Sequence, residues 1–99
     1  MLRSKYEDWL ARASRHKGMQ KDARCRGVDV FFVSALDFAE CEPDTWQSEF
    51  MQDYTDDGFI VEEAAAELSG WYFRPLNESG EPTGPFASID DAMVEAFGR

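Results

Sequence analysis

Carboxylates carry most of the chemistry that this sequence could perform, because they bind cations and exchange protons. The twelve residues DYTDDGFIVEEA, from Asp53 to Ala64, hold five of them around one glycine. Oxygen ligands grouped around a tight turn are what Ca²⁺ binds. Adjacent carboxylates such as Asp56 and Asp57 could also share acid–base work, but divided acid and base roles require different environments. The sequence gives these two residues no such difference, so we predict no catalytic site.

The same stretch resembles the calcium loop of the EF-hand family, over these twelve residues only. The resemblance rests on the first ligand, the third ligand, the turn glycine and the following hydrophobe, which are Asp53, Asp57, Gly58 and Ile60. An EF-hand loop ends in a bidentate Glu at its twelfth position, where this sequence has Ala64. Glu63 comes one residue early, about 100° away around a helix, and Thr-Asp-Asp-Gly is also a common helix-ending turn. A degenerate EF-hand-like calcium binder is therefore a minor alternative, and we predict no metal site.

Other residue types that support catalysis or cofactor binding are sparse. His16 is the only histidine, and it stands near the end of a basic helix, where we expect it to be exposed. Cys25 and Cys41 lack CxxC spacing, which indicates two reduced thiols in a cytoplasmic protein. The sequence has no glycine-rich phosphate loop and no zinc-ligand spacing. We therefore predict a protein that is not an enzyme and uses no cofactor.

The charge of the chain is acidic and unevenly placed. The 99 residues carry ten Lys and Arg against twenty Asp and Glu, a formal net charge of -10. Residues 1–27 hold eight of the cations and three of the acids, whereas residues 28–99 hold two cations and seventeen acids. An acidic body of this kind repels phosphate backbones, so residues 28–99 are not expected to bind nucleic acid directly. The imbalance favours a partner that is itself basic.

A length of 99 residues predicts a single domain, residues 1–99, and hydrophobic periodicity predicts that it is of the α+β class. We expect a small antiparallel sheet of two or three strands packed with about four helices, in the order α-β-α-α-β-(β)-α. The expected helices are 4–18, 44–54, 61–69 and 88–97. The expected strands are 28–34, 71–76 and a short return at 85–87. Residues 1–27 form the basic helix and its connector, and residues 28–99 form the acidic body.

Local signals set the expected ends of these elements. A capping box at Ser4 begins the first helix, and Gly18 ends it. Asp44 is the expected cap of the second helix, and Gly70 closes the third. Pro75 indicates that the second strand lies at an edge or ends there.

Two of the expected helices repeat one pattern. VEEAAAEL (61–68) and IDDAMVEA (89–96) both read apolar, acid, acid, Ala, two variable residues, Glu. At 100° per residue, each helix places small apolar residues on one side and three carboxylates on the other. Four acids of the helix 44–54 and the turn after it, Glu49, Asp53, Asp56 and Asp57, are added to these two triads. The predicted partner-binding residues are therefore Glu49, Asp53, Asp56, Asp57, Glu62, Glu63, Glu67, Asp90, Asp91 and Glu95.

Acids on the wet face of one helix are ordinary, but these acids lack counterions. From residue 28 onward the only cations are Arg74 and Arg99, although a helix tuned for stability pairs Glu with Lys four residues on. Carboxylates one helical turn apart stand about 5–6 Å from each other, near the ~7 Å between successive phosphates. In size and charge the chain resembles small acidic inhibitors encoded by phages and plasmids, among them anti-CRISPR and anti-restriction proteins. The resemblance implies a nucleic-acid mimic that inhibits a basic protein or ribonucleoprotein complex.

The basic start of the chain leaves a second interpretation open. Its cations could contact nucleic acid, fold against the acidic body, or form the contact patch of a homodimer. The alternative function is a small protein-interaction subunit or regulator that uses this basic N-terminal helix. No stretch reaches the ~20 apolar residues of a membrane span, and the N-terminus has no apolar signal region. We therefore expect no membrane partner and a cytoplasmic location.

Overall fold

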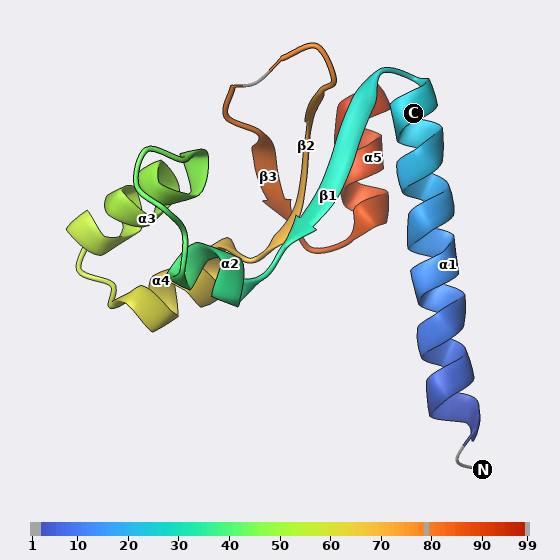
Figure 1. The fold of residues 1–99 in the computed structure, drawn as a ribbon, viewed down its shortest axis with the longest axis horizontal. Coiled ribbons are helices and arrows are strands. Elements are labelled where there is room, and N and C mark those ends of the chain that lie inside the picture. Colours follow the sequence, from blue (N-terminus) through green and yellow to red (C-terminus); the bar gives the residue numbers. More distant parts are fainter. Residues whose placement is uncertain (1–2, 79, 99) are drawn as a thin grey trace.

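A three-stranded antiparallel sheet separates two groups of helices (Figure 1). The computed structural model describes residues 3–78 and 80–98, with the side chains of residues 14–78 and 80–98. In chain order the elements are α1 (Arg3–Cys25), β1 (Val28–Val33), α2 (Ala35–Ala39), α3 (Trp46–Asp56), α4 (Val61–Leu68), β2 (Gly70–Pro75), β3 (Thr83–Phe86) and α5 (Ile89–Phe97). The predicted α+β class and antiparallel sheet are confirmed, and the return strand is present as β3.

The sheet has the order β1-β2-β3, so β2 is its central strand. Pro75 is the last residue of β2, which confirms the strand-end reading of this proline and excludes the edge reading. Val30 pairs with Phe73, and Phe31 pairs with Tyr72. Side chains alternate between the two faces of a strand, so Val30 and Phe73 pack toward α1 and α5 whereas Phe31 and Tyr72 pack toward α2, α3 and α4. The sheet therefore serves two separate cores.

The first core lies between the sheet and the pair α1 and α5, which run side by side (Figure 1). Ala23 of α1 is completely buried, and Gln20 Nε2 donates a hydrogen bond of 2.9 Å to the Val30 carbonyl oxygen. The rings of His16 and Trp71 form a T-shaped pair, with 5.0 Å between their centroids. The prediction that His16 is an exposed helix-end residue is wrong, because α1 continues past it and its ring is partly buried.

The second core lies between the sheet and α2, α3 and α4. Phe38 and Tyr72 are both 0% exposed there, and Trp46 stands 5.0 Å from Tyr72 by ring centroids. Each such ring contributes about 1.5–3 kcal/mol by leaving water. The Tyr72 hydroxyl donates to the Leu68 carbonyl oxygen, which satisfies its one polar group. Burial, with a smaller contribution from Tyr54, raises the pKa of the Tyr72 phenol above its ordinary value.

Helix α1 is longer than the sequence indicates. The predicted end at Gly18 and the predicted connector 19–27 are wrong, since α1 continues to Cys25. A glycine inside a helix costs about 1 kcal/mol, but the burial of Met19 and Ala23 against the sheet outweighs that cost. Gly27, at φ +90°, follows the end of the helix. The predicted capping box at Ser4 involves side chains outside the described set. None of the helices within residues 3–78 and 80–98 combines the length and the apolar character that a membrane span needs.

Helix caps account for two further differences in the middle of the chain. Ser34 caps α2, a helix that the sequence analysis missed, by accepting from the Asp37 N–H while the Asp37 carboxylate accepts from the Ser34 N–H. This box is S-x-x-D, whereas the usual form ends in Glu or Gln. Helix α3 is capped by Thr45, which accepts from the Ser48 N–H at 3.2 Å. The prediction that Asp44 is the cap is wrong by one residue.

Gly70 belongs to the sheet and does not close a helix. Helix α4 ends at Leu68, with Ser69 as its C-cap, so the predicted role of Gly70 is wrong. A Cβ at position 70 would lie 2.9 Å from the Phe86 carbonyl oxygen and 2.9 Å from Pro85 Cβ. The close approach of β3 is therefore the reason for glycine at this position.

Candidate functional site

The carboxylates gather most densely in the helical group that contains α2, α3 and α4. We call residues 34–69, which comprise these helices and their loops, the acidic lobe. It holds eleven Asp and Glu and no Lys, Arg or His. All eleven side chains are exposed. They are Asp37, Glu40, Glu42, Asp44, Glu49, Asp53, Asp56, Asp57, Glu62, Glu63 and Glu67.

Helix α3 aligns three of these acids along its length. Glu49, Asp53 and Asp56 are spaced i, i+4, i+7 and therefore lie on one side of the helix. Asp56 and Asp57 stand at the C-terminal end of α3, where the helix dipole disfavours negative charge by about 0.3–1 kcal/mol each. No basic residue occupies that last turn. Helix stability therefore does not explain the acids at this end.

Helix α4 presents its three carboxylates as the sequence predicts. Ala64, Ala65 and Leu68 are buried against the second core. Their burial fixes the rotation of α4 and leaves Glu62, Glu63 and Glu67 exposed. Because α4 packs against α2 and α3, this triad belongs to the same lobe as the acids of α3.

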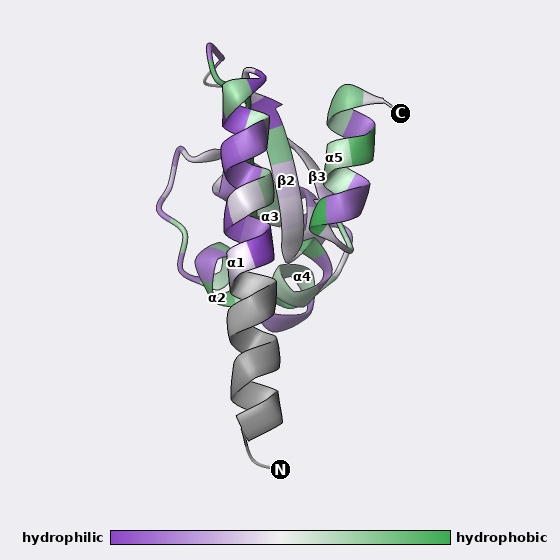
Figure 2. Ribbon diagram, turned by 90° about the vertical axis from the view of Figure 1, so that its right-hand side faces the viewer, coloured by the Kyte–Doolittle hydropathy of each residue, from purple (hydrophilic) through white to green (hydrophobic). Residues whose placement is uncertain are grey.

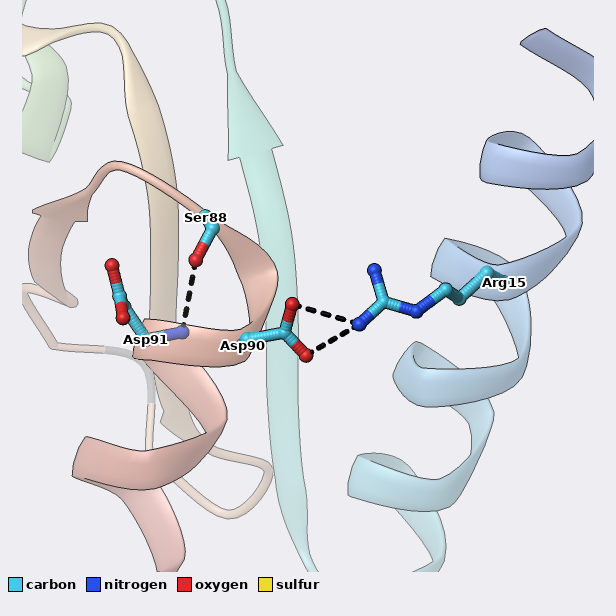
Figure 3. Close-up of polar contacts among 4 residues, drawn as sticks. All are labelled: Arg15, Ser88, Asp90 and Asp91. Atoms are coloured by element: carbon cyan, nitrogen blue, oxygen red, sulfur yellow. Dashed lines mark hydrogen bonds and ion pairs between the residues drawn. The ribbon is translucent and has the colours of Figure 1, made fainter. Parts of the chain in front are cut away.

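The matching triad of α5 lies on the other side of the sheet (Figure 1). Asp90, Asp91 and Glu95 are exposed there. Arg15 Nη2 lies 2.6 Å and 2.8 Å from the two carboxylate oxygens of Asp90 (Figure 3), and this contact raises the pKa of the Arg15 guanidinium. The Asp91 N–H donates to Ser88 Oγ, which caps α5. The ten predicted residues thus form two separate groups, and α1 already partly neutralises the smaller one.

The turn TDDGF, which lies within the twelve residues that resemble a calcium loop, is a helix-ending motif. The Gly58 N–H donates to the Thr55 carbonyl oxygen, and the Phe59 N–H donates to the Tyr54 carbonyl oxygen. Gly58 has a φ of +99°, and the rings of Phe59 and Tyr54 pack 5.5 Å apart. This paired pattern with its hydrophobic contact is a Schellman motif. Residues 53–56 and 61–64 are helical, so the twelve residues do not form one open loop.

No described cation forms an ion pair with a carboxylate of the acidic lobe. Two ion pairs occur between described side chains, Arg15–Asp90 and Arg26–Asp22, and neither reaches the acidic lobe. Arg74 stacks 5.6 Å from the centroid of Phe31 and donates to the Gly80 carbonyl oxygen. Carboxylates of the acidic lobe that lack counterions repel one another, which costs stability.

Asp37, Glu40, Glu42 and Asp44 of the acidic lobe, and Glu81 outside it, were not among the predicted partner-binding residues. Asp44 and Glu81 line a surface hollow of about 410 Å³ with Glu49 and Trp46. Glu81 comes from the β2–β3 loop, and only the fold brings it beside α3. Asp44 could have been found from the sequence, as part of a run of acids without a cation between residues 34 and 69.

The arrangement suits electrostatic binding of a large cationic surface. Acids spread over three helices do not converge on one point, and the residues 14–78 and 80–98 place no three His, Cys, Asp or Glu side chains together for a metal ion.

Comparison with known proteins assigns no family, since no family model, no curated protein and no solved structure matches the chain.

Proposed function

We propose that this chain is a small non-enzymatic inhibitor that docks its acidic lobe on the basic surface of a nucleic-acid-handling protein or ribonucleoprotein complex. It acts by occupying that surface in place of DNA or RNA. The class of protein that we propose is that of phage- or plasmid-encoded inhibitors such as anti-CRISPR and anti-restriction proteins. The observation that carries it is the set of eleven exposed carboxylates in the acidic lobe without one cation among them.

An acidic surface without counterions lowers the stability of the free protein, because its carboxylates repel one another. A Lys- and Arg-lined nucleic-acid groove presents the opposite charge, and it releases its own bound ions when a polyanion docks. Rows of acids about one helical turn apart on α3 and α4 fit a groove that accepts a row of phosphates. Binding of this kind weakens steeply as salt rises from about 50 to 200 mM.

Affinity capture from a bacterial lysate tests the proposal. The immobilised chain is expected to retain basic nucleic-acid-binding proteins, and an excess of duplex DNA or RNA should elute them for identification by mass spectrometry. The matched control carries amides in place of the acids of α3, its terminal turn and α4: Glu49, Asp53, Asp56, Asp57, Glu62, Glu63 and Glu67. Retention that persists in excess nucleic acid, or equally on the control, would contradict mimicry by the acidic lobe.

The outward side of α1 favours a second candidate function, that of an interaction subunit or regulator. Lys17, Lys21 and Arg24 are exposed at spacing i, i+4, i+7 and form no ion pair with another described side chain. Figure 2 looks onto this side of α1 and shows mainly hydrophilic residues there. Arg15 is tied to Asp90 and is therefore left out of this set.

Charge reversal on α1 separates the two candidates. The variant is Lys17→Glu, Lys21→Glu, Arg24→Glu. If the partner docks on the acidic lobe, the amount of partner that the variant captures and nucleic acid then elutes should stay within about twofold of the wild-type amount. Binding through α1 predicts that affinity for the partner falls about tenfold or more. Three reversed contacts of about 0.5–1 kcal/mol each together exceed the 1.4 kcal/mol that corresponds to a tenfold change in affinity. Circular dichroism of the variant checks that α1 stays helical.

A further inference from the structure

The turn between α3 and α4, with the first residue of α4, exposes three large apolar residues in succession. Phe59, Ile60 and Val61 have 38%, 58% and 46% of their surface exposed. Single exposed apolar residues are ordinary on folded proteins, whereas a contiguous group marks a contact surface. We call these three residues the apolar knuckle.

The backbone holds the apolar knuckle in one position. The Schellman motif fixes Phe59 through its N–H bond to the Tyr54 carbonyl oxygen, and the two rings pack together. Ile60 then begins α4 through its carbonyl oxygen, which accepts from the Ala64 N–H at 2.9 Å. A surface presented this way loses little conformational entropy on binding.

The residue at the start of α4 is unfavourable for the helix itself. Ile60 is the N-cap and makes no side-chain capping hydrogen bond. The N-caps of α2, α3 and α5, which are Ser34, Thr45 and Ser88, all make one. Branched apolar residues rank among the poorest N-caps, and Ile60 is also the most exposed residue of the apolar knuckle. Neither helix stability nor burial therefore explains isoleucine at this position.

Carboxylates border the apolar knuckle on both sides along the chain. Asp56 and Asp57 precede it and Glu62 and Glu63 follow it, and all four are exposed. An apolar centre within a charged rim is the usual anatomy of a protein interface, whose central apolar side chains carry most of the affinity. The charge of the rim sets the chemistry of the partner, which must be cationic around an apolar site.

We propose that the apolar knuckle is the anchor of the acidic lobe and inserts into an apolar site ringed by Lys and Arg on the partner. This inference rests on the proposed function and adds a contact that nucleic acid itself does not make. The acids then supply attraction and orientation, and Ile60 with its neighbours slows dissociation.

The variant Ile60→Asp tests the anchor, because it removes an apolar contact and at the same time adds a negative charge that a cationic partner should attract. Aspartate is a favourable N-cap, so the melting temperature should rise by about 4–8 °C, while the negative charge of the acidic lobe increases by one. The probes are a synthetic helical peptide of Lys and Leu and its partner peptide in which every Leu is Ser, measured by calorimetry. The Leu peptide should bind Ile60→Asp about tenfold or more weakly than wild type, while the Ser peptide binds both alike or Ile60→Asp slightly tighter.

Matched variants and outcomes keep the two proposals apart. Val94→Asp changes an apolar residue that is also exposed, at 46% against 58% for Ile60, but lies on α5 across the sheet, and it should leave binding of the Leu peptide within about twofold. Ile60→Ser adds a cap without charge and should lose affinity as Ile60→Asp does. If Ile60→Asp binds the Leu peptide as well as wild type, or Val94→Asp loses as much, the anchor is wrong while docking by charge stands. If neither peptide binds wild type, both proposals fail.

Discussion

Replacing Gly84 with alanine is expected to destabilise the fold by about 2–4 kcal/mol, lowering the melting temperature by about 10–25 °C. A Cβ at this position would lie 2.6 Å from Cδ2 of Tyr72 and 2.7 Å from the Trp71 carbonyl oxygen. The Tyr72 ring is completely buried in the second core, and the other atom belongs to the backbone of the central strand. Neither neighbour can move without disturbing the sheet, so either β3 shifts or the core opens.

Gly18→Ala is the matched control, and its effect has the opposite sign. No heavy atom would lie within 4 Å of the added Cβ, and position 18 is inside α1. Alanine should therefore stabilise the protein by about 0.5–1 kcal/mol through helix propensity. Thermal unfolding followed by circular dichroism measures both variants. If Gly84→Ala melts within about 2 °C of wild type, the close approach of β3 to Tyr72 is not the constraint we describe.

Neutralising the α4 triad is expected to weaken capture of the partner about 10- to 100-fold. The variant is Glu62→Gln, Glu63→Gln, Glu67→Gln, and each lost ion pair contributes about 0.5–1 kcal/mol. The three side chains are exposed, so the substitution should change the free energy of unfolding by less than about 1 kcal/mol. Loss of binding would then reflect the surface and not the fold.

The α5 triad supplies a control with the same pattern and the same change in net charge. Asp90→Asn, Asp91→Asn, Glu95→Gln removes three charges on the far side of the sheet, one of which Arg15 already pairs. This variant should keep capture within about twofold of wild type. Equal losses from the two triads would mean that the partner senses net charge and not the acidic lobe.

The local patterns of this sequence predict much of the fold correctly. The small apolar stripe of α4 follows from residue order alone, because Ala64, Ala65 and Leu68 share one side of an ideal helix. The same periodicity correctly predicts that the acids of α4 and α5 are exposed. The Schellman turn after α3 is also readable, since TDDG is a typical helix end.

Tertiary contacts explain what local patterns miss. Gly18 is a plausible helix end, yet the contacts of Met19 and Ala23 with the sheet continue α1 to Cys25. Gly70 looks like a helix cap, although the approach of β3 is what requires it. Residue order also cannot tell on which side of a sheet a helix packs. For that reason the triads of α4 and α5 look like parts of one site in the sequence and lie apart in the structure.

Hydrogen–deuterium exchange on the complex with the captured partner tests the central claim most directly. Docking through the acidic lobe predicts that binding slows exchange in α3, in the turn at Phe59 and Ile60, and in α4, while α1 and α5 exchange as in the free protein. Protection confined to α1 or α5, with α3 and α4 unchanged, would contradict the claim and assign the contact to the opposite side of the sheet.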